Sequence, residues 1–357
     1  MAERTLTKRE LNRALLARQL LLERAKLPIP RALERVGGLQ TQDARSGYIG
    51  LWSRLDAFER DDLTKALERR SVVQATLMRV TIHTVSARDY PVLTEGVREE
   101  RRKSWVQGHS KRIDVTKMPA AAKRVRSLLD GGPRWRREVV DELGLDSATW
   151  NGVGMWLDLV RVPPSGTWER PRGDLYATAS TWLGDSEATA AEGRELLLRR
   201  YLGAFGPASL KDAANWAGVP PKVLAPVAER LKLRRFKAED GTELLDLPRA
   251  PLPEAETPAP VRFLPTWDAT LLAHARRTQI LPERHRAKVF NTRTPHSLST
   301  FLVDGHVAGS WKYERGRVHT TPFERLPKTK MRELEDEAER LAAFIDGQAG
   351  CAPFDSQ

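Results

Sequence analysis

The chain has little cysteine and no long hydrophobic run. Cys351 is the single cysteine among 357 residues, which excludes an intramolecular disulfide and is typical of a reducing compartment. No stretch approaches the roughly 20 consecutive apolar residues that a membrane-spanning helix needs. The first residues lead into a charged, amphipathic segment rather than the apolar core of a signal peptide. We therefore expect a cytoplasmic protein without a membrane partner.

The common motifs of cofactor and metal enzymes are also missing. The sequence contains no GxGxxG after a strand, no Walker A loop, no HExxH and no GxSxG. One cysteine and seven scattered histidines provide no ligand spacing typical of zinc. We therefore expect neither a cofactor nor a metal, and the usual cofactor enzymes are disfavoured.

Charge of one sign is in excess. The chain has 59 Lys and Arg residues against 47 Asp and Glu residues, a formal net charge of +12. Such an excess favours a polyanionic partner. The alternative is an Arg-rich solvated surface, and composition by itself does not separate the two.

Helices followed by strand pairs recur along the chain. Thr7 and Glu10 form a capping-box pattern that predicts the first helix. Hydrophobic periodicity then predicts groups of helices, each followed by a hairpin, which is the order of a winged helix. The clearest group ends in a hairpin with an Asp-Gly turn at 240–241. The predicted helices lie at 30–36, 47–55, 61–69, 136–143, 147–157, 196–205, 210–217, 220–231 and 328–345, and the predicted strand pairs at 72–85, 159–176, 233–247 and 301–311.

These elements predict an α+β fold that is mainly helical, with tandem winged-helix units, a β-rich C-terminal segment and a terminal helix. Five prolines among the thirteen residues 248–260 predict a linker or an extended strap. We expect four parts. Residues 1–95 form a first winged helix, and residues 96–190 form a basic connector and a second winged helix. Residues 191–250 form a third winged helix, and residues 251–357 contain a linker, a DNA-probing β-hairpin segment and the terminal helix.

Two glutamines stand out at a helix-to-helix junction, in the segment GGLQTQDA at 37–44. Gln40 and Gln42 are two residues apart, so in an extended segment their side chains point the same way. Two amides on one side can hold a water molecule or the edge of a base. The alternative is that they cap helix ends or bond to the backbone. Asp43 either assists the same chemistry or caps the next helix.

Several further motifs, in order along nearly the whole chain, make the sequence resemble the AlkZ-type winged-helix DNA glycosylases. The resemblance implies three tandem winged helices around a concave basic surface. It implies excision of N7-alkylated guanine, including bulky adducts and crosslinks. The motifs are GLQTQD at 38–43, YIGLWSRL at 48–55, MRVTIH at 78–83, RYLGAFGPA at 200–208, FLPTWD at 263–268, VDG at 303–305 and GSW at 309–311.

The resemblance assigns catalysis to Gln40 and Gln42, which match the family's Gln-x-Gln element. A related branch has Asp at the second position, so Gln42 places this chain with the AlkZ-like branch. Thr41 departs from the apolar middle residue of that element. A cationic alkylpurine leaves as a neutral base without protonation, and positioning of water supplies much of the acceleration. Direct attack by water needs no catalytic lysine.

DNA-binding residues are expected in two places. Between 284 and 317, seven basic and two acidic residues give a net charge of +5, and the segment matches the family's DNA-probing hairpin. The alternative is a solvated edge protected by charge. Arg79 and His83 are expected at the first wing, although a lone histidine is as readily a core residue. The C-terminal candidates are Arg284, His285, Arg286, Lys288, Arg293 and Lys312.

A non-catalytic winged-helix transcriptional regulator is the alternative function. Such regulators usually dimerise to match two half-sites, and the sequence offers no dimerisation helix besides 328–345. We therefore expect a monomer whose partner is double-stranded DNA with alkylated purines. Five tryptophans in apolar surroundings are expected in the core: Trp52, Trp156, Trp216, Trp267 and Trp311.

Overall fold

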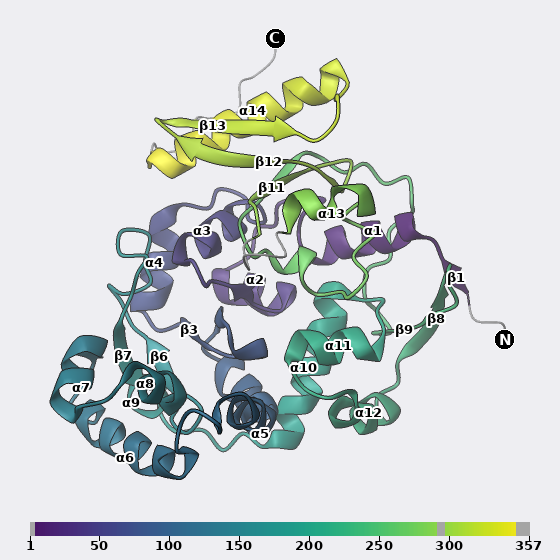
Figure 1. Ribbon diagram of the computed structural model, residues 1–357. Helices are drawn as coiled ribbons and strands as arrows, with labels where there is room; N and C mark the ends of the chain where they lie inside the picture. Colours follow the sequence, from purple (N-terminus) through teal and green to yellow (C-terminus); the bar gives the residue numbers. More distant parts are fainter. Residues whose placement is uncertain (1–3, 291–296, 348–357) are drawn as a thin grey trace.

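The fold is α+β, with a helical body and three β-sheets (Figure 1). The computed structural model describes residues 4–290 and 297–347. Within this part, every helix is too short or too polar to cross a membrane. The helices are α1 (Lys8–Arg18), α2 (Ile29–Val36), α3 (Ala44–Trp52), α4 (Arg60–Glu68), α5 (Asp89–His109), α6 (Met118–Leu129), α7 (Arg136–Leu143), α8 (Ser147–Val153), α9 (Ala179–Leu183), α10 (Ala190–Phe205), α11 (Leu210–Ala217), α12 (Pro221–Arg230), α13 (Glu283–Val289) and α14 (Lys328–Asp346).

The sheets join segments that are far apart in the sequence. One has six strands in the order β2-β4-β3-β6-β7-β5, one has four in the order β10-β11-β12-β13, and one pairs β1 in parallel with the β8–β9 hairpin. The strands are β1 (Thr5–Leu6), β2 (Leu39–Gln40), β3 (Val72–Thr76), β4 (Ile82–Ser86), β5 (Arg134–Trp135), β6 (Leu159–Arg161), β7 (Leu175–Thr178), β8 (Arg234–Ala238), β9 (Glu243–Asp246), β10 (Arg262–Leu264), β11 (Thr300–Val303), β12 (His306–Glu314) and β13 (Arg317–Pro322).

Local sequence signals place most of these elements. The capping box at Thr7 and Glu10 is formed in both directions, and α1 follows it. Ser209 caps α11, which ends at Gly218 in the left-handed conformation. Asp304 and Gly305 both have positive φ and turn β11 into β12, as the Asp-Gly pair predicts.

The expected boundary at 95/96 falls inside α5. The basic stretch near residue 100, expected as a connector, is largely the second half of this helix. In addition, β3 of the first segment pairs with β6 of the second. The first two expected parts therefore share a sheet and a helix.

Within the predicted strand pair at 159–176, the second strand is expected over 168–176, but β7 begins only at Leu175. Trp168 packs edge-on against Tyr48, with ring centroids 5.6 Å apart, and against Phe344 at 5.8 Å. Trp168 is thus buried in a cluster with residues of α3 and α14, outside the strand.

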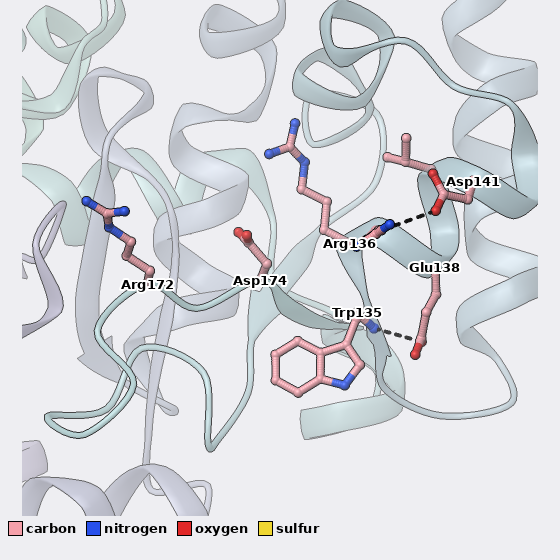
Figure 2. A pocket seen from close by; sticks show the side chains of 8 residues that line it. Trp135, Arg136, Glu138, Asp141, Arg172 and Asp174 are labelled. Carbon is pink, nitrogen blue, oxygen red and sulfur yellow. Dashed lines mark hydrogen bonds and ion pairs between the residues drawn. The ribbon is translucent and has the colours of Figure 1, made fainter.

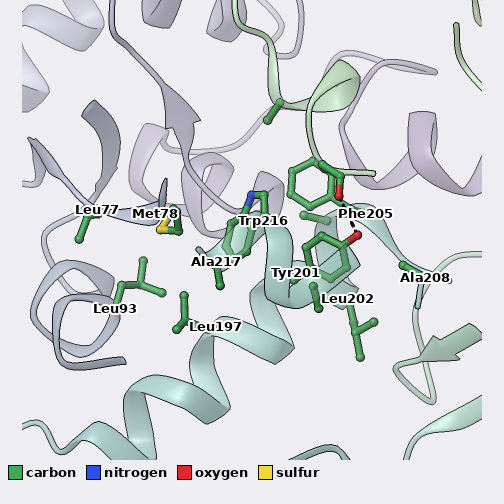
Figure 3. Packing of buried hydrophobic residues seen from close by; sticks show 14 of the residues in the cluster. Leu77, Met78, Leu93, Leu197, Tyr201, Leu202, Phe205, Ala208, Trp216 and Ala217 are labelled. Atoms are coloured by element: carbon green, nitrogen blue, oxygen red, sulfur yellow. Dashed lines mark hydrogen bonds between the residues drawn. The ribbon is translucent and has the colours of Figure 1, made fainter. Parts of the chain in front are cut away.

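The largest core lies where α5, α10 and α11 meet. Helices α5 and α10 touch at Gly96 and Gly193, where a Cβ on Gly96 would lie 2.6 Å from the carbonyl carbon of Gly193. Tyr201 and Phe205 of α10 pack against Trp216 of α11 at 5.5 and 5.9 Å between ring centroids (Figure 3). This core fixes α11 relative to the body.

Arg18 of α1 is fully buried and holds the proline-rich strap. Its guanidinium forms a two-pronged ion pair with Asp246, which is also fully buried, at 2.6 and 3.0 Å. The same group donates to the carbonyl oxygens of Leu202 and Pro251. The strap expected at 248–260 is therefore tied to α1, α10 and β9.

Removing one partner of this pair leaves an unpaired buried charge. We expect Arg18→Met or Asp246→Asn to lower the free energy of unfolding by about 3–5 kcal/mol. As a control, Lys26→Ala removes an exposed pair with Asp56 at 3.6 Å and should change it by less than about 0.5 kcal/mol. Urea unfolding followed by circular dichroism measures both. Equal effects of the buried and exposed substitutions would contradict this role.

Candidate active site

Gln40 lies in β2, at the edge of the six-stranded sheet, opposite His83 of β4. Its side chain is 8% exposed, and its Oε1 accepts a hydrogen bond of 2.8 Å from Nη2 of Arg79. Nη1 of Arg79 donates to the carbonyl oxygen of Trp216 at 2.7 Å. The orientation of the Gln40 amide is therefore set by a guanidinium that is anchored on α11.

Gln42 lies on the exposed side of the same segment. Its Oε1 accepts a hydrogen bond of 3.2 Å from the backbone N–H of Ile82. Thr41, between the two glutamines, is fully buried and hydrogen-bonds Thr84 at 3.0 Å. Both glutamine amides therefore meet the hairpin between β3 and β4, while the middle residue faces inward.

The tip of the β3–β4 hairpin has a strained backbone. Arg79 and Val80 both adopt the left-handed conformation, with φ of 52° and 58°. For a β-branched residue this is a rare conformation that needs support from its surroundings. Part of that support is Gly218, where a Cβ would lie 2.7 Å from the backbone nitrogen of Arg79.

The guanidinium of Arg79 is a partly buried cation next to Gln40. Burial lowers the pKa of Arg79 to about 10, so its guanidinium stays protonated at neutral pH. Asp43 caps α3 by accepting a hydrogen bond from the N–H of Arg45 at 3.0 Å, and its side chain is exposed. The capping interpretation of Asp43 is therefore confirmed, and the solvent-facing part of the carboxylate lies next to Gln42 in the chain.

His83 is inside the protein, at 2% exposure, with Nδ1 3.0 Å from the carbonyl oxygen of Thr81. Burial, followed by the nearby charge of Arg79, lowers the pKa of His83 to about 3. The ring is thus neutral at physiological pH. This placement supports the core-residue alternative, because a buried neutral imidazole is not available to a phosphate.

The segment at 284–289 is a helix and not a hairpin. Pro282 precedes α13, Glu283 lies in its first turn, and Arg286 and Lys288 lie in its last turn. These are helix signals that the hairpin interpretation overlooked. The neighbouring hairpin is β12–β13, which carries Lys312 beside Glu314 at 3.0 Å.

The charges of α13 are largely paired. Arg284 and His285 both hydrogen-bond Glu324, and Arg284 first and His285 second lower the pKa of that carboxyl to about 2. His285 is 4% exposed, whereas Arg286 and Lys288 are exposed. Arg293 lies outside the described residues. The C-terminal candidates are thus split between a helix and a strand, with His285 inside.

Trp267 is a residue that the sequence placed wrongly. It is half-buried with φ of 62°, and within the described chain it and Trp135 are the tryptophans outside every hydrophobic cluster. The backbone N–H of Trp267 donates to Oγ of Ser297, and the side chain of the preceding Thr266 hydrogen-bonds Ser46 of α3. Hydrophobic periodicity does not show that this residue lies outside the clusters.

A surface pocket lies beside β5 and α7 (Figure 2). Neither glutamine lines it. Strands β2 and β5 are the two edges of the six-stranded sheet, so five strand spacings, about 24 Å, separate them. Three cations and three carboxylates line the pocket, which gives no net charge to attract a phosphate. These residues are Arg136, Arg137, Arg172, Glu138, Asp141 and Asp174. Across residues 4–290 and 297–347, no group of His, Cys, Asp or Glu side chains is arranged to hold a metal ion.

The low pKa of His83 predicts how stability depends on pH. The unfolded chain binds a proton near pH 6.5, while the folded chain resists it until about pH 3. The contribution of His83 is complete above pH 6.5 and falls with acidification by up to about 1.4 kcal/mol per pH unit. Urea unfolding at pH 7 and pH 5 should show a smaller loss for His83→Gln than for the wild type. An identical loss in both proteins would mean that His83 is not buried in its neutral form.

Comparison with known proteins places the chain in a family. The profile of the family described as DNA glycosylase AlkZ-like matches residues 33–344. A curated relative, the interstrand DNA cross-link repair glycosylase of Streptomyces sahachiroi, is 22% identical over 364 aligned positions that cover 91% of this chain and 93% of the relative. The solved structure of Streptomyces sahachiroi DNA glycosylase AlkZ superimposes with a TM-score of 0.78 and 19% identity, covering 97% of each chain, which establishes a common fold. The chain belongs to the AlkZ-like DNA glycosylases, which are hydrolases acting on N-glycosyl bonds.

Proposed function

We propose that this glycosylase is monofunctional and hydrolyses the N-glycosidic bond of N7-alkylguanine and related cationic alkylpurines in duplex DNA. The observation that carries the proposal is that both glutamines hydrogen-bond the β3–β4 hairpin, Gln40 through Arg79 and Gln42 through the N–H of Ile82. Within the described residues, neither amide hydrogen-bonds a carboxylate or a lysine. Amides of this kind suit a reaction in which water is positioned and the leaving group is already activated.

The chemistry needs no strong base. Water attacks C1′ of the sugar, the bond to N9 breaks, and its electron pair neutralises the positive charge of the departing base. The attacking water keeps one proton as the new hydroxyl group and loses the other to solvent. An amide orients the water but does not take its proton near neutral pH. In this scheme Gln42 contacts the water, and Gln40, fixed by Arg79, orients water or sugar. The same reasoning predicts poor activity on unmodified bases.

The fold supports a tandem winged-helix architecture as part of the proposal. Three successive groups of helices each end in a hairpin, namely α2–α4 with β3–β4, α6–α8 with β6–β7, and α10–α12 with β8–β9. We assign duplex DNA to the surface between them. The expected partner residues are Arg79 and the C-terminal cations. Of these cations, Arg284, Arg286, Lys288 and Lys312 are exposed, and Arg293 lies outside the described residues.

Bulky adducts and interstrand crosslinks are within the proposed substrate range. The relative from Streptomyces sahachiroi is named for cross-link repair. In this chain Gln42 is exposed to solvent beside the β3–β4 hairpin. On this proposal a lesion is hydrolysed there without full extrusion of the base. We further propose that the protein acts as a monomer in the cytoplasm. The transcriptional regulator is not favoured, because the family consists of glycosylases.

Substitution of the glutamines tests the reaction directly. Gln40→Ala and Gln42→Ala should each slow release of N7-methylguanine by about ten- to a thousand-fold, the scale of a missing transition-state interaction. The double variant should lose less than the product of both, because the amides act on one water. Gln42→Asp should retain activity on small cationic lesions. Single-turnover assays of abasic sites measure these rates, and a folded double variant that works at the wild-type rate would refute the assignment.

The C-terminal cations are tested by a charge-matched comparison. Arg284→Ala, Arg286→Ala and Lys288→Ala together should weaken duplex binding and reduce the slope of log K against log salt by about 2–3, close to one unit for each phosphate that is no longer neutralised. The melting temperature should change little, because exposed charges contribute little to stability.

A control for charge alone removes three exposed cations elsewhere, Lys26, Lys117 and Arg137. Both triple variants lower the net charge by the same amount. If they weaken duplex binding equally, α13 has no specific role in contacting DNA.

A further inference from the structure

The exposed tip of the β3–β4 hairpin presents an apolar side chain beside the glutamines. We propose that Val80 is a wedge that enters the base stack at the lesion and separates the damaged base pair from its neighbour. This inference rests on the proposed function, since it assigns a DNA contact to the same site. It concerns a residue of the MRVTIH motif at 78–83 to which the sequence analysis assigned no role.

Val80 is one of the few large hydrophobic side chains that are exposed in the described part of the chain. Its exposed fraction is 39%, and in the described part of the chain only Leu27 and Leu298 share this property. A lone exposed valine needs no explanation by itself. Here it lies between Arg79, which donates to Gln40, and Ile82, whose N–H donates to Gln42. Val80 therefore belongs to the same hairpin tip whose neighbouring residues hydrogen-bond both amides.

The backbone conformation at residue 80 is unfavourable for valine, which suggests that the side chain has a function. With φ of 58°, residue 80 has the conformation that glycine and asparagine adopt most readily. A β-branched residue there is strained, and the side chain gains little burial in return. Strain of this kind is retained at sites where the surroundings fix the conformation for a function.

The surroundings do fix the tip. The backbone N–H of Leu77 donates to the carbonyl oxygen of Thr81 at 3.0 Å, and the N–H of Thr81 donates to the carbonyl oxygen of Met78 at 3.1 Å. Arg79 is anchored on Trp216, and Gly218 lies against its backbone. The methyl groups of Val80 are thus presented on a rigid turn, which a wedge requires because a mobile side chain would fold away from the stack.

Apolar side chains that enter between base steps are an established way to unstack and bend DNA, at a few kcal/mol per step. Unstacking at the lesion brings the sugar C1′ into reach of water held by the glutamines. The wedge also accounts for hydrolysis without a deep pocket, because the damaged base only has to be separated from its neighbour.

Base unstacking is measured with a fluorescent probe. The substrate is a duplex with 2-aminopurine next to a 2′-fluorinated N7-methylguanine, whose glycosidic bond resists hydrolysis. Wild-type protein should raise 2-aminopurine fluorescence on binding. Val80→Gly should lose most of this rise in fluorescence. Its rate of N7-methylguanine excision should fall about tenfold, because the wedge no longer contributes to the free energy of unstacking. Val80→Leu should retain both signals.

Stability separates the wedge from a structural role. Because Val80→Gly relieves the positive-φ strain, its melting temperature should equal or exceed that of the wild type. Leu27→Ala, at a residue with the same exposed fraction, should leave fluorescence and excision unchanged. A folded Val80→Gly variant with the wild-type fluorescence rise would overturn the wedge while leaving the glycosylase assignment intact. If the wild type releases no base, the fluorescence comparison still decides the role of Val80.

Discussion

Burial of arginine side chains is the constraint on which the rest of the structure depends. Arg13, Arg18 and Arg54 have essentially no solvent exposure. A buried guanidinium is tolerated only if carboxylates and carbonyls surround it, so each one draws distant segments together. Arg18 joins α1 to Asp246 and the proline-rich strap, and Arg54 joins α3 to Asp268 at 2.9 Å and to Gln19 of the first turn after α1. Arg13 holds Asp304, at the turn of the C-terminal sheet. The parts that sequence patterns separate are thus locked into one body.

The same principle reaches the active site through Arg79. This side chain connects the carbonyl of Trp216, in the largest core, to the amide of Gln40. The orientation of a proposed catalytic amide therefore depends on how α11 packs against α10, far from it in the sequence. Glutamine suits such a site because the departing nucleobase is already activated by its positive charge. The reaction therefore needs an oriented water molecule and no strong acid or general base. His83, which is buried in β4 opposite Gln40, is neutral and adds no competing charge.

Charge excess, by contrast, says little about where DNA lies. The sequence is strongly basic, yet many of its cations are paired: Arg284 with Glu324, Arg286 with Glu283 and Lys312 with Glu314. Exposed pairs of this kind are weak, so a phosphate can replace the carboxylate partner. The described C-terminal cations sit on a short helix and a neighbouring hairpin rather than on one ribbon.

The sequence by itself determined the α+β class, most helix starts and ends, the Asp-Gly turns, the strap at 248–260 and the glutamine pair, because capping, turn chemistry and hydrophobic periodicity act within a few residues. It also determined the family, through motifs in a fixed order. Only the tertiary structure decided that α5 crosses the expected boundary, that Trp168 leaves its strand, that His83 is inside and that Trp267 is outside the core. It alone placed Arg79 on Gln40 and Val80 at a strained, exposed tip. These outcomes depend on burial and on contacts between residues tens to hundreds of positions apart, about which local patterns carry no information.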